Sequence, residues 1–311
     1  MNPPPKKIEK KRIVVLGAAG RLGGSLVNFL EKDHSVIALT RENLNLGNLP
    51  SISAALEPLD YDFLLLCGAL TGVDYCETHE EEAYAVNAEA PRRIAEISAA
   101  KGAHVTYFST DMVFNGSKGT PYLESDTTGP VSVYGASKLK GEEYILRASP
   151  ANLVVRVSWL YGPGKPAFPE WIVDKACAEK NLTLPGNKIC CPTYSVDLVE
   201  CIIALLFPQD GGAASGVFHL CNSEPCTWRD WGQFCVDTAR DAGLPVIAAE
   251  IEGVPVDSVA AFVAKRPAYS AMGTGKFTRF TGISPRPWKA AIREFLPQSD
   301  CFRKHHQLLT E

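Results

Sequence analysis

Short apolar runs rich in β-branched residues alternate with longer segments of helical periodicity over the first two thirds of the chain. Each run has the length of one buried strand. Because a parallel sheet is covered by helices on both faces, this alternation predicts an α/β, doubly wound parallel (Rossmann) sheet. The expected strands span 12–16, 35–39, 63–67, 104–108, 153–157 and 217–220, and the expected helices span 22–32, 80–100, 134–147 and 195–206.

The regular alternation fades after Tyr161, where Pro, Gly and Trp become more frequent and shorter helices are expected. We interpret these parts as a smaller, discontinuous substrate-binding lobe over the carboxyl edge of the sheet. The Gly162-Pro-Gly164 junction is a candidate hinge for that lobe. The predicted division assigns 11–163 and 193–222 to an NADP-binding domain, 164–192 and 223–311 to the lobe, and 1–10 to a flexible N-terminus.

The composition is that of an ordinary soluble globular protein, with 46% apolar and 21% charged residues in a chain of 311. A net charge of -4 gives no electrostatic reason to expect binding to nucleic acid or to a membrane surface. The N-terminus lacks the apolar segment of a signal peptide, and the longest apolar runs are too short to span a bilayer. Ten cysteines form no C-x-x-C pair, and only the adjacent Cys190 and Cys191 have an unusual spacing, so we expect a cytoplasmic protein with reduced thiols.

Tyr134 and Lys138 have a spacing that carries chemistry. On a helix, residues four apart lie on one face, so the phenol and the ammonium would stand side by side. A nearby fixed cation favours the phenolate, and we therefore expect the pKa of Tyr134 to be lowered toward neutrality. Such a tyrosine can protonate an alkoxide as it forms. A second pair with this spacing, Tyr161 and Lys165, encloses Gly-Pro-Gly, which cannot hold a helix, so its side chains are not expected to share a face.

A glycine-rich turn, Gly17-Ala-Ala-Gly20-Arg-Leu-Gly23, follows the first expected strand and opens the first expected helix. Its glycines permit a tight turn, close approach of the backbone to a pyrophosphate, and close packing of helix on strand. In isolation the turn could be merely structural, but at the head of a βαβ pattern it predicts a dinucleotide site. The cofactor contacts predicted in it are Gly17, Gly20, Arg21, Leu22 and Gly23.

The end of the second expected strand bears on the choice of nicotinamide cofactor. An acid that reads the ribose would fall about 20 residues after the turn, where Arg41 and Glu42 stand. An arginine without an acid at the strand end suits a 2′-phosphate, so NADP(H) is the preferred interpretation. In the alternative interpretation, Glu42 binds the ribose and Arg41 is a solvent-facing loop charge.

The fourth expected strand runs into Phe108-Ser-Thr110, 24 residues before Tyr134. A Thr110 hydroxyl at the carboxyl edge of the sheet could bond a substrate carbonyl oxygen, although such hydroxyls are often local caps. The glycine turn, Thr110, Tyr134 and Lys138 follow one another in the order that a reductase needs. We therefore predict Thr110, Tyr134 and Lys138 as the catalytic set.

Together these residues resemble the extended short-chain dehydrogenase/reductase family, and further motifs are similar to its dTDP-4-dehydrorhamnose reductase branch. The similarity is collinear from about Arg12 to Leu296. The motifs are Thr71-Gly-Val-Asp74, Ala83-Tyr-Ala-Val-Asn87-Ala88, Ser109-Thr-Asp-Met-Val-Phe114, Arg156-Val-Ser-Trp159-Leu-Tyr161-Gly162, Pro192-Thr193 with Asp197-Leu198, and Arg266-Pro267 with Ser270.

The resemblance implies that NADPH delivers hydride to the 4-keto carbon of a nucleotide-linked deoxysugar, with dTDP-4-dehydro-L-rhamnose the first substrate to try. Tyr134 would protonate the oxyanion, Lys138 would lower the pKa of Tyr134 and bond the nicotinamide ribose, and Thr110 would orient the carbonyl. Asn87 would support a proton relay. Implied contacts are Asn45, Leu46, Cys67, Gly68 and Ala69 for the cofactor, and Thr71, Asp111, Met112, Trp159 and Arg266 for the substrate. Two of these have structural alternatives, because Trp159 could be core packing and Arg266 could bridge the lobes.

The chain departs from the family pattern on the substrate side. Met112 stands where tyrosine is usual, and the segment 187–191 replaces the usual Asp-Gln and glycine before Pro192. Ser25 occupies the place of a metal-binding glutamate, so no metal is predicted. These departures leave the identity of the sugar open.

Two other functions stay open at this point. The chain could be a non-catalytic NADP-binding regulatory subunit, because the β-subunit of methionine adenosyltransferase is similar to the same branch. Met112 and the altered loop favour regulation, whereas the intact catalytic set and Trp159 favour catalysis. The chain could also reduce another nucleotide sugar or a small ketone. The expected partners are a nucleotide sugar together with either a second copy in a homodimer or, in the regulatory interpretation, a catalytic subunit.

Overall fold

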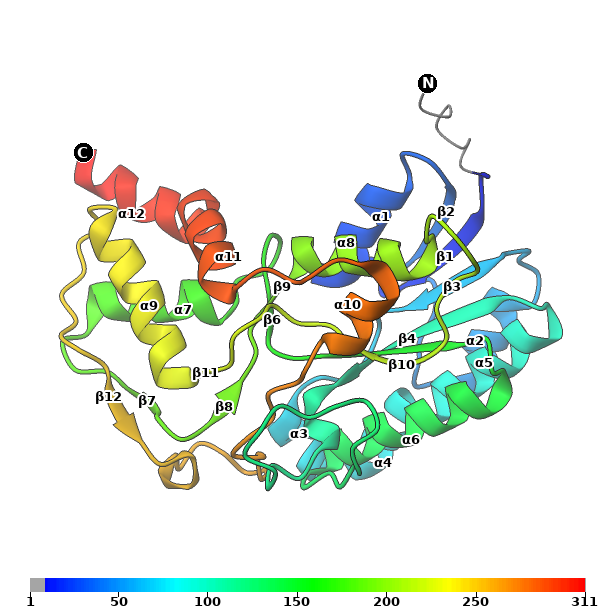
Figure 1. The fold of residues 1–311 in the computed structure, drawn as a ribbon, viewed down its shortest axis with the longest axis horizontal. Coiled ribbons are helices and arrows are strands. Elements are labelled where there is room, and N and C mark those ends of the chain that lie inside the picture. Colours follow the sequence, from blue (N-terminus) through cyan, green and yellow to red (C-terminus); the bar gives the residue numbers. More distant parts are fainter. Residues whose placement is uncertain (1–8, 311) are drawn as a thin grey trace.

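The computed structural model describes residues 9–310, so residues 1–8 of the predicted flexible N-terminus lie outside it. Six parallel strands form one central sheet in the order β10-β5-β4-β3-β1-β2 (Figure 1). The strand order reverses at β1, which creates the crevice where doubly wound sheets bind ligands. The strands are β1 (Arg12–Leu16), β2 (Ser35–Leu39), β3 (Phe63–Leu66), β4 (His104–Thr110), β5 (Leu153–Val157) and β10 (Gly216–His219). The predicted fold class is confirmed, and β1, β2 and β5 have the expected bounds.

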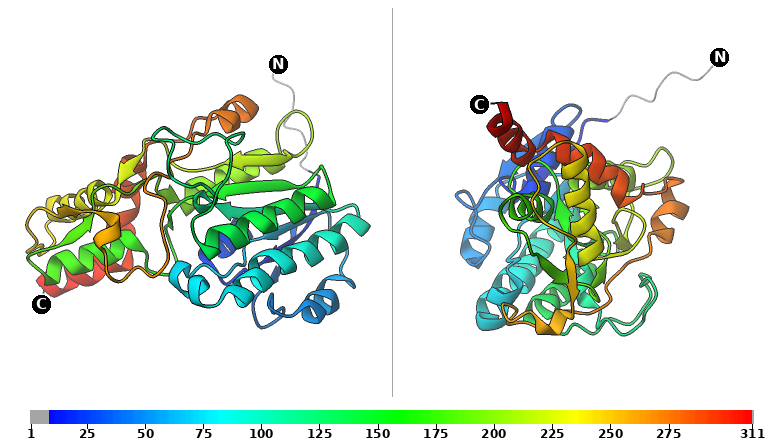
Figure 2. Two further views of the ribbon diagram at one scale, coloured as in Figure 1. Left: turned by 90° about the horizontal axis from the view of Figure 1, so that it is seen from below. Right: turned by 90° about the vertical axis from the view of Figure 1, so that its left-hand side faces the viewer.

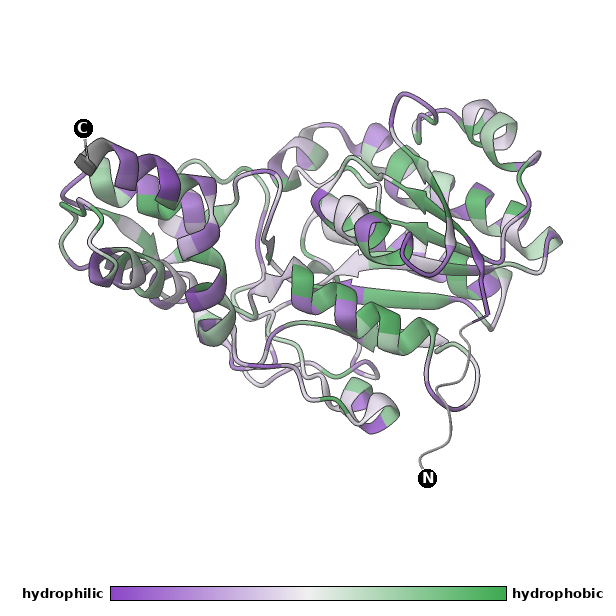
Figure 3. Ribbon diagram, turned by 90° about the horizontal axis from the view of Figure 1, so that it is seen from above, coloured by the Kyte–Doolittle hydropathy of each residue, from purple (hydrophilic) through white to green (hydrophobic). Residues whose placement is uncertain are grey.

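The two faces of the sheet are covered by different helices, as expected from the alternating apolar residues of its strands (Figure 2). Ile13 and Val15 of β1 pack with α1 (Arg21–Leu30) and α8 (Ser195–Leu206). Val14 and Leu16 face the opposite core. That core includes residues of α2 (Leu49–Leu56), α5 (Ala90–Ala100) and α6 (Val133–Ala148). The strands are hydrophobic over most of their length, whereas the covering helices are mixed (Figure 3).

The segment predicted as one helix over 80–100 is continuous but not uniform. It consists of α4 (Glu80–Tyr84), a π-helical turn over Ala85–Glu89, and α5. The π-helical turn packs closely on α6, because a Cβ added to Gly141 would lie 2.3 Å from the Asn87 oxygen. That oxygen also accepts a hydrogen bond of 2.8 Å from Tyr107 Oη. The turn therefore fixes the buried Asn87 against both α6 and β4. A short helix, α3 (Val73–Thr78), precedes it.

A second core lies beside the sheet, on the left of Figure 1, among helices that follow Tyr161. Its largest fully buried side chains include Trp231, Trp288 and Phe302. The helices are α7 (Phe168–Ala178), α9 (Trp228–Asp241), α11 (Trp288–Phe295) and α12 (Asp300–Thr310). The prediction of shorter helices here is wrong for α9, which has 14 residues.

Three short strand pairs lie outside the central sheet. They are β6 (Leu160–Tyr161) with β9 (Thr193–Tyr194), β7 (Thr183–Pro185) with β12 (Glu252–Val254), and β8 (Ile189–Cys190) with β11 (Cys226–Thr227). One helix of the predicted lobe segment, α10 (Gly275–Thr281), instead places Phe277 in the core of the sheet with α8. The proposed division into two domains stays a prediction.

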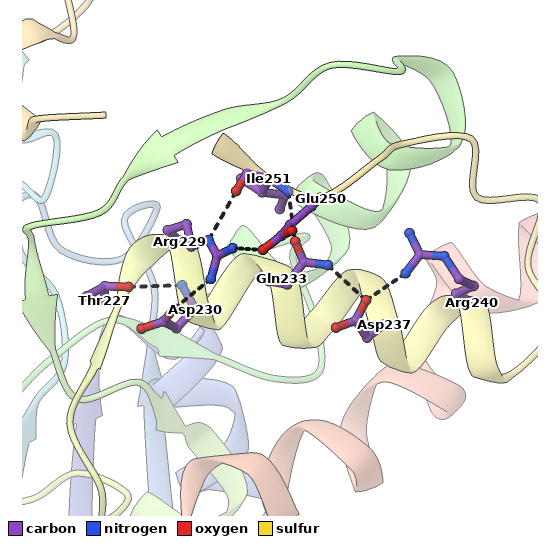
Figure 4. Close-up of polar contacts among 8 residues, drawn as sticks. All are labelled: Thr227, Arg229, Asp230, Gln233, Asp237, Arg240, Glu250 and Ile251. Carbon is purple, nitrogen blue, oxygen red and sulfur yellow. Dashed lines mark hydrogen bonds and ion pairs between the residues drawn. The ribbon is translucent and has the colours of Figure 1, made fainter. Parts of the chain in front are cut away.

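Polar contacts hold the segment before β12 against α9 (Figure 4). Arg229 Nε donates to the Ile251 oxygen at 3.1 Å, and its Nη2 donates to Glu250. Gln233 Oε1 accepts from the Ile251 nitrogen at 2.8 Å. These bonds fix the start of β12 and so align it with β7.

Two further features complete the description. In residues 9–310, no helix combines the length and the apolar character that crossing a membrane requires. All ten cysteines are free thiols in the structure, and none forms a disulfide.

Candidate active site

A cleft of about 640 Å³ lies over the carboxyl edge of the sheet, where β1, β3, β4 and β5 end. A second cavity of about 420 Å³ adjoins it, and Gly17, Arg41, Gly68 and Ala69 line both, so the two form one groove. The predicted site residues that line the larger cleft are Gly17, Gly20, Arg21, Leu22, Gly23, Arg41, Cys67, Gly68, Ala69, Thr71, Thr110, Tyr134, Lys138 and Trp159. Asn45 and Leu46 line the smaller cavity, whereas Asp111, Met112 and Arg266 line neither.

The glycine turn fits the close approach of a pyrophosphate. Gly17 has a φ of 81°, and a Cβ there would lie 2.7 Å from the Gly68 nitrogen. A Cβ on Gly23 would lie 2.3 Å from the Gly17 oxygen. Helix α1 begins at Gly20 without a side-chain cap, so its first N–H groups can bond an anion in the cleft. Ser109 Oγ also lines the cleft and is buried without a partner among the described residues. These features fit a dinucleotide.

Arg21, predicted as a cofactor contact, also has a structural role. Its guanidinium donates hydrogen bonds to the main-chain oxygens of Gly162 and Lys165. It therefore ties the glycine turn to the candidate hinge Gly162-Pro-Gly164 and to the residue that follows it. Burial lowers the pKa of Arg21 from its ordinary value.

The side chain of Arg41 is exposed and lines both cavities, whereas the neighbouring Glu42 lines neither. The Glu42 nitrogen donates to Thr40 Oγ1 at 3.3 Å within the loop that follows β2. This arrangement supports the interpretation in which Arg41 faces the cofactor.

Thr110, Tyr134 and Lys138 come together at the end of β4 and the start of α6. The side chains of Thr110 and Tyr134 both line the cleft. Lys138 Nζ donates to the Phe108 oxygen at 2.6 Å and lies 3.9 Å from the ring centroid of Tyr107. Thr110 is in addition a local cap, because its Oγ1 accepts from the Met112 nitrogen at 3.2 Å. The structure is therefore compatible with Thr110 both as a local cap and as a member of the catalytic set.

The predicted effect of Lys138 on Tyr134 is wrong. Burial, and next the charge of Asp111, raise the pKa of Tyr134, and the neighbouring Thr110 hydroxyl offsets this only in part. Burial lowers the pKa of Lys138 to about 7. Desolvation penalises the charged form of each group, and the ammonium donates to a strand carbonyl rather than to the phenol. Tyr134 therefore holds its proton at neutral pH, as a proton donor must.

Asp111 lies under the cleft, in a buried hydrogen-bond network. Its side chain is 3% exposed, and its carboxylate accepts from Thr110 Oγ1 at 3.2 Å and from Ser158 Oγ at 3.0 Å. Ser270 Oγ donates to the same carboxylate and accepts from Lys188 Nζ at 2.6 Å. The structure therefore gives Asp111 a role in supporting Thr110, and it does not bring Asp111 to the cleft surface.

Comparison with known proteins identifies the family. The family model for the RmlD substrate binding domain matches residues 11–301. The chain belongs to the RmlD substrate binding domain family. It is 35% identical over 92% of its length to 95% of a Streptomyces antibioticus protein named probable dTDP-4,6-dihydroxy-2-methyloxan-3-one 4-ketoreductase. It is 33% identical over 96% of its length to 95% of the dTDP-4-dehydrorhamnose reductase of Streptomyces griseus.

A solved structure agrees with this assignment. The dTDP-4-dehydrorhamnose reductase of Bacillus anthracis in complex with NADP superposes with a TM-score of 0.85 at 26% identity, over 94% of this chain and 100% of that chain. The predicted resemblance to the dTDP-4-dehydrorhamnose reductase branch is confirmed.

Trp159 and Arg266, two RmlD-family motif residues, have clear structural roles. Trp159 has a φ of 46°, lines the cleft and packs edge-on against Trp228 at 4.3 Å between ring centroids. Both of its interpretations are therefore compatible with the structure. Arg266 pairs with Asp74 through hydrogen bonds of 3.0 and 2.6 Å and stacks on Phe262 at 3.7 Å. Because it lines neither cavity, the structure supports the bridging alternative for Arg266.

Asn87 and Met112 also support the site from outside the cleft. Asn87 Oδ1 accepts from the Leu70 nitrogen at 2.9 Å, and its Nδ2 donates to Ser137 Oγ at 3.1 Å. Asn87 thereby fixes the loop after β3 against α6. The Met112 oxygen would lie 2.2 Å from a Cβ on Gly135, so α6 begins in close contact with the turn after β4.

The second Tyr-x-x-x-Lys pair does not form a site. Tyr161 lies in β6 and is fully buried in the second core, whereas Lys165 is exposed. The prediction that these two side chains share no helix face is confirmed.

The position that could have held the family's metal-binding glutamate has another function here. Ser25 Oγ donates to the Arg21 oxygen at 2.9 Å within α1. In the described part of the chain, one group of three metal-ligating side chains comes together, Asp174, Cys301 and His305, away from the cleft. His305 Nε2 lies 2.8 Å from Asp174 Oδ1, so the group joins α7 to α12.

Lys188 and Ser158 were not predicted as site residues. Each is buried and reaches the catalytic set only through Asp111. A weak signal existed for Lys188, because it stands in the loop that departs from the RmlD-family pattern.

Proposed function

We propose that this protein is an NADP(H)-dependent oxidoreductase that reduces the 4-keto group of a nucleotide-linked deoxysugar, and that dTDP-4-dehydro-L-rhamnose is its substrate. The observation that carries the proposal is one cleft lined by the glycine turn together with Thr110, Tyr134 and Lys138. The reductase names of the relatives, and the NADP complex of the Bacillus anthracis enzyme, support it. The ten free thiols support a cytoplasmic location.

Each residue of the cleft would have its own role in binding or catalysis. The backbone of the Gly17–Gly23 turn would hold the pyrophosphate, and Arg41 would bind the 2′-phosphate. NADPH, when bound, supplies the hydride. Tyr134 Oη holds a proton at neutral pH and would donate it to the carbonyl oxygen of the sugar as that oxygen gains charge. Thr110 Oγ1, which lies beside Tyr134 in the lining of the cleft, would position the Tyr134 hydroxyl toward that oxygen.

Lys138 would act through its position and its charge. Its Nζ is fixed by the Phe108 oxygen beneath the cleft, and its pKa of about 7 lets it carry or release a proton near neutral pH. It would therefore supply positive potential beside the oxygen that receives the proton, and bond a ribose hydroxyl of the cofactor.

The experiment follows the loss of NADPH absorbance with a panel of 4-keto nucleotide sugars that includes dTDP-4-dehydro-L-rhamnose. We expect turnover with at least one member, and the highest kcat/KM with dTDP-4-dehydro-L-rhamnose. Turnover of only another nucleotide sugar would show that dTDP-4-dehydro-L-rhamnose is not the substrate. Met112 and the segment 187–191 would then be the first residues to examine for the difference in specificity. Tight NADPH binding without turnover of any member would favour the regulatory subunit.

A further inference from the structure

We propose that Lys188 and Ser270 are positioning residues that set the direction of the Thr110 hydroxyl beside Tyr134, acting through the buried carboxylate of Asp111. This inference rests on the proposed reductase function, in which Thr110 positions the proton donor Tyr134. It assigns a role to the loop over 187–191, where this chain departs from its family.

The hydrogen bonds form one unbroken chain. Lys188 Nζ donates to Ser270 Oγ at 2.6 Å, and Ser270 Oγ donates to Asp111 Oδ2. Thr110 Oγ1 donates to Asp111 Oδ1 at 3.2 Å, and Thr110 and Tyr134 both line the cleft. A buried ammonium is thus connected through Ser270 and Asp111 to the Thr110 hydroxyl beside the proposed proton donor.

The chemistry of the two charged groups fixes the direction of every bond in the chain. An ammonium can only donate hydrogen bonds, and an ionised carboxylate can only accept them. Ser270 must therefore accept from Lys188 and give its own hydrogen to Asp111. Thr110 likewise gives its single hydrogen to Asp111, so its oxygen acts only as a hydrogen-bond acceptor beside Tyr134. A neutral side chain in place of Lys188 would remove this constraint.

Because these side chains are buried, leaving any of them without a hydrogen-bond partner would cost free energy. The exposed fractions are 2% for Lys188, 0% for Ser270, 3% for Asp111 and 5% for Thr110. A buried carboxylate needs compensating hydrogen bonds or a cation, and Ser158 Oγ and Ser270 Oγ both converge on Asp111. Lys188 is the cation linked to it through Ser270, and its pKa is lowered by burial while Asp111 opposes that shift.

The members of the chain come from both sides of the molecule. Asp111 follows β4 and Ser158 follows β5, so these two lie at the carboxyl edge of the sheet. Lys188 precedes β8, and Ser270 lies in a segment paired with it, since the Ser270 nitrogen donates to the Ile189 oxygen at 2.8 Å. The orientation of Thr110 therefore depends on how the segments after Tyr161 pack on the sheet.

The first test measures kcat and the NADPH dissociation constant for Lys188→Met and for the milder Ser270→Ala. We expect each to lower kcat by roughly 10- to 100-fold through misorientation of Thr110, with NADPH affinity unchanged. In a Thr110→Val background, the same substitutions should have little further effect. A purely structural role would lower kcat in both backgrounds and weaken NADPH binding as well.

Lys276→Met is the matched control. Lys276, a partly buried lysine, also donates to an oxygen, that of Val217 at 2.6 Å, but it lies outside the cleft. Its substitution should leave kcat unchanged. Equal kcat for wild type, Lys188→Met and Ser270→Ala would overturn the proposal.

A second readout separates this proposal from the proposed function. Lys188→Met, Thr110→Val and the double variant are compared by urea unfolding, which requires no turnover. If the chain couples the two residues, their effects on the free energy of unfolding are not additive. Additive effects would overturn the chain even in an active enzyme, whereas an inactive wild type with non-additive effects would reject the reductase function alone.

Discussion

Lys138 Nζ donates a hydrogen bond of 2.6 Å to the main-chain oxygen of Phe108. This bond fixes the ammonium of Lys138 against β4. The ammonium therefore does not bond to the phenol of Tyr134, which lies one helical turn earlier. Because it is also buried, its pKa falls to about 7. The site thus combines a protonated phenol with a lysine that titrates near neutral pH.

This lysine makes the stability of the protein depend on pH. Between about pH 7 and pH 10.5, the unfolded chain holds a proton on Lys138 that the folded protein has lost. The free energy of unfolding therefore gains up to about 1.4 kcal/mol per pH unit from this group as the pH rises through that window. Urea unfolding of wild type and Lys138→Met across the window should show the difference moving in favour of wild type. A difference that does not change with pH would contradict the buried, desolvated lysine.

The two adjacent glycines of α1 should respond differently to alanine. A Cβ on Gly23 would meet the Gly17 oxygen at 2.3 Å, whereas one on Gly24 would meet the Ala18 oxygen at 3.3 Å. We expect Gly23→Ala to displace the turn, to lower stability and to weaken NADPH binding by about 10-fold or more. Gly24→Ala, the matched control, should change both far less. Titration of cofactor fluorescence gives the affinities, and equal losses would argue against the close packing of this turn.

We expect Arg41 to determine the preference for NADPH over NADH. Loss of a charge-assisted contact to a 2′-phosphate is worth about 1.5–3 kcal/mol, so Arg41→Ala should weaken NADPH by roughly 10- to 100-fold and NADH little. Glu42→Ala is the control, and it should leave both affinities near the wild-type values. If Glu42→Ala instead weakens NADH and Arg41→Ala affects both cofactors equally, then Glu42 reads the ribose.

Arg266 and Asp74 should behave as one unit. Their side chains form two hydrogen bonds between segments 192 residues apart, and this pairing, mainly the hydrogen bond from Arg266, lowers the pKa of Asp74 to about 2. We expect Arg266→Ala to destabilise the protein and to leave the KM for the sugar nearly unchanged. In a double-mutant cycle with Asp74→Ala, the coupling should be on the order of 1 kcal/mol. A raised KM with unchanged stability would restore the substrate-binding prediction for Arg266.

The sequence predicted those elements whose signal is local. The strands β1, β2 and β5 and the helix α8 have the predicted bounds, because continuous apolar runs and helical periodicity are read within each segment. In α9 a usable signal was missed. Its buried residues Trp228, Trp231, Cys235 and Ala239 recur at helical spacing over 14 residues, but the frequent Pro and Gly around them suggested shorter helices.

Contacts between distant parts of the chain could not be predicted. Spacing placed Lys138 on the face of Tyr134, yet it could not show that β4 offers the ammonium a carbonyl oxygen, that of Phe108. The spacing also could not show that Asp74 would pair with Arg266, or that Lys188 would be linked to Asp111 through Ser270. Each of these depends on tertiary packing, which no local pattern encodes.

The most direct test of the account compares Tyr134→Phe with Tyr161→Phe in NADPH-dependent turnover of dTDP-4-dehydro-L-rhamnose. Both substitutions remove one hydroxyl from a Tyr-x-x-x-Lys pair, but only Tyr134 lines the cleft. The account predicts that Tyr134→Phe lowers kcat by roughly 100- to 10,000-fold with NADPH affinity retained, and that Tyr161→Phe keeps near wild-type turnover. Turnover by Tyr134→Phe within a few-fold of wild type would contradict the assignment of Tyr134 as the proton donor.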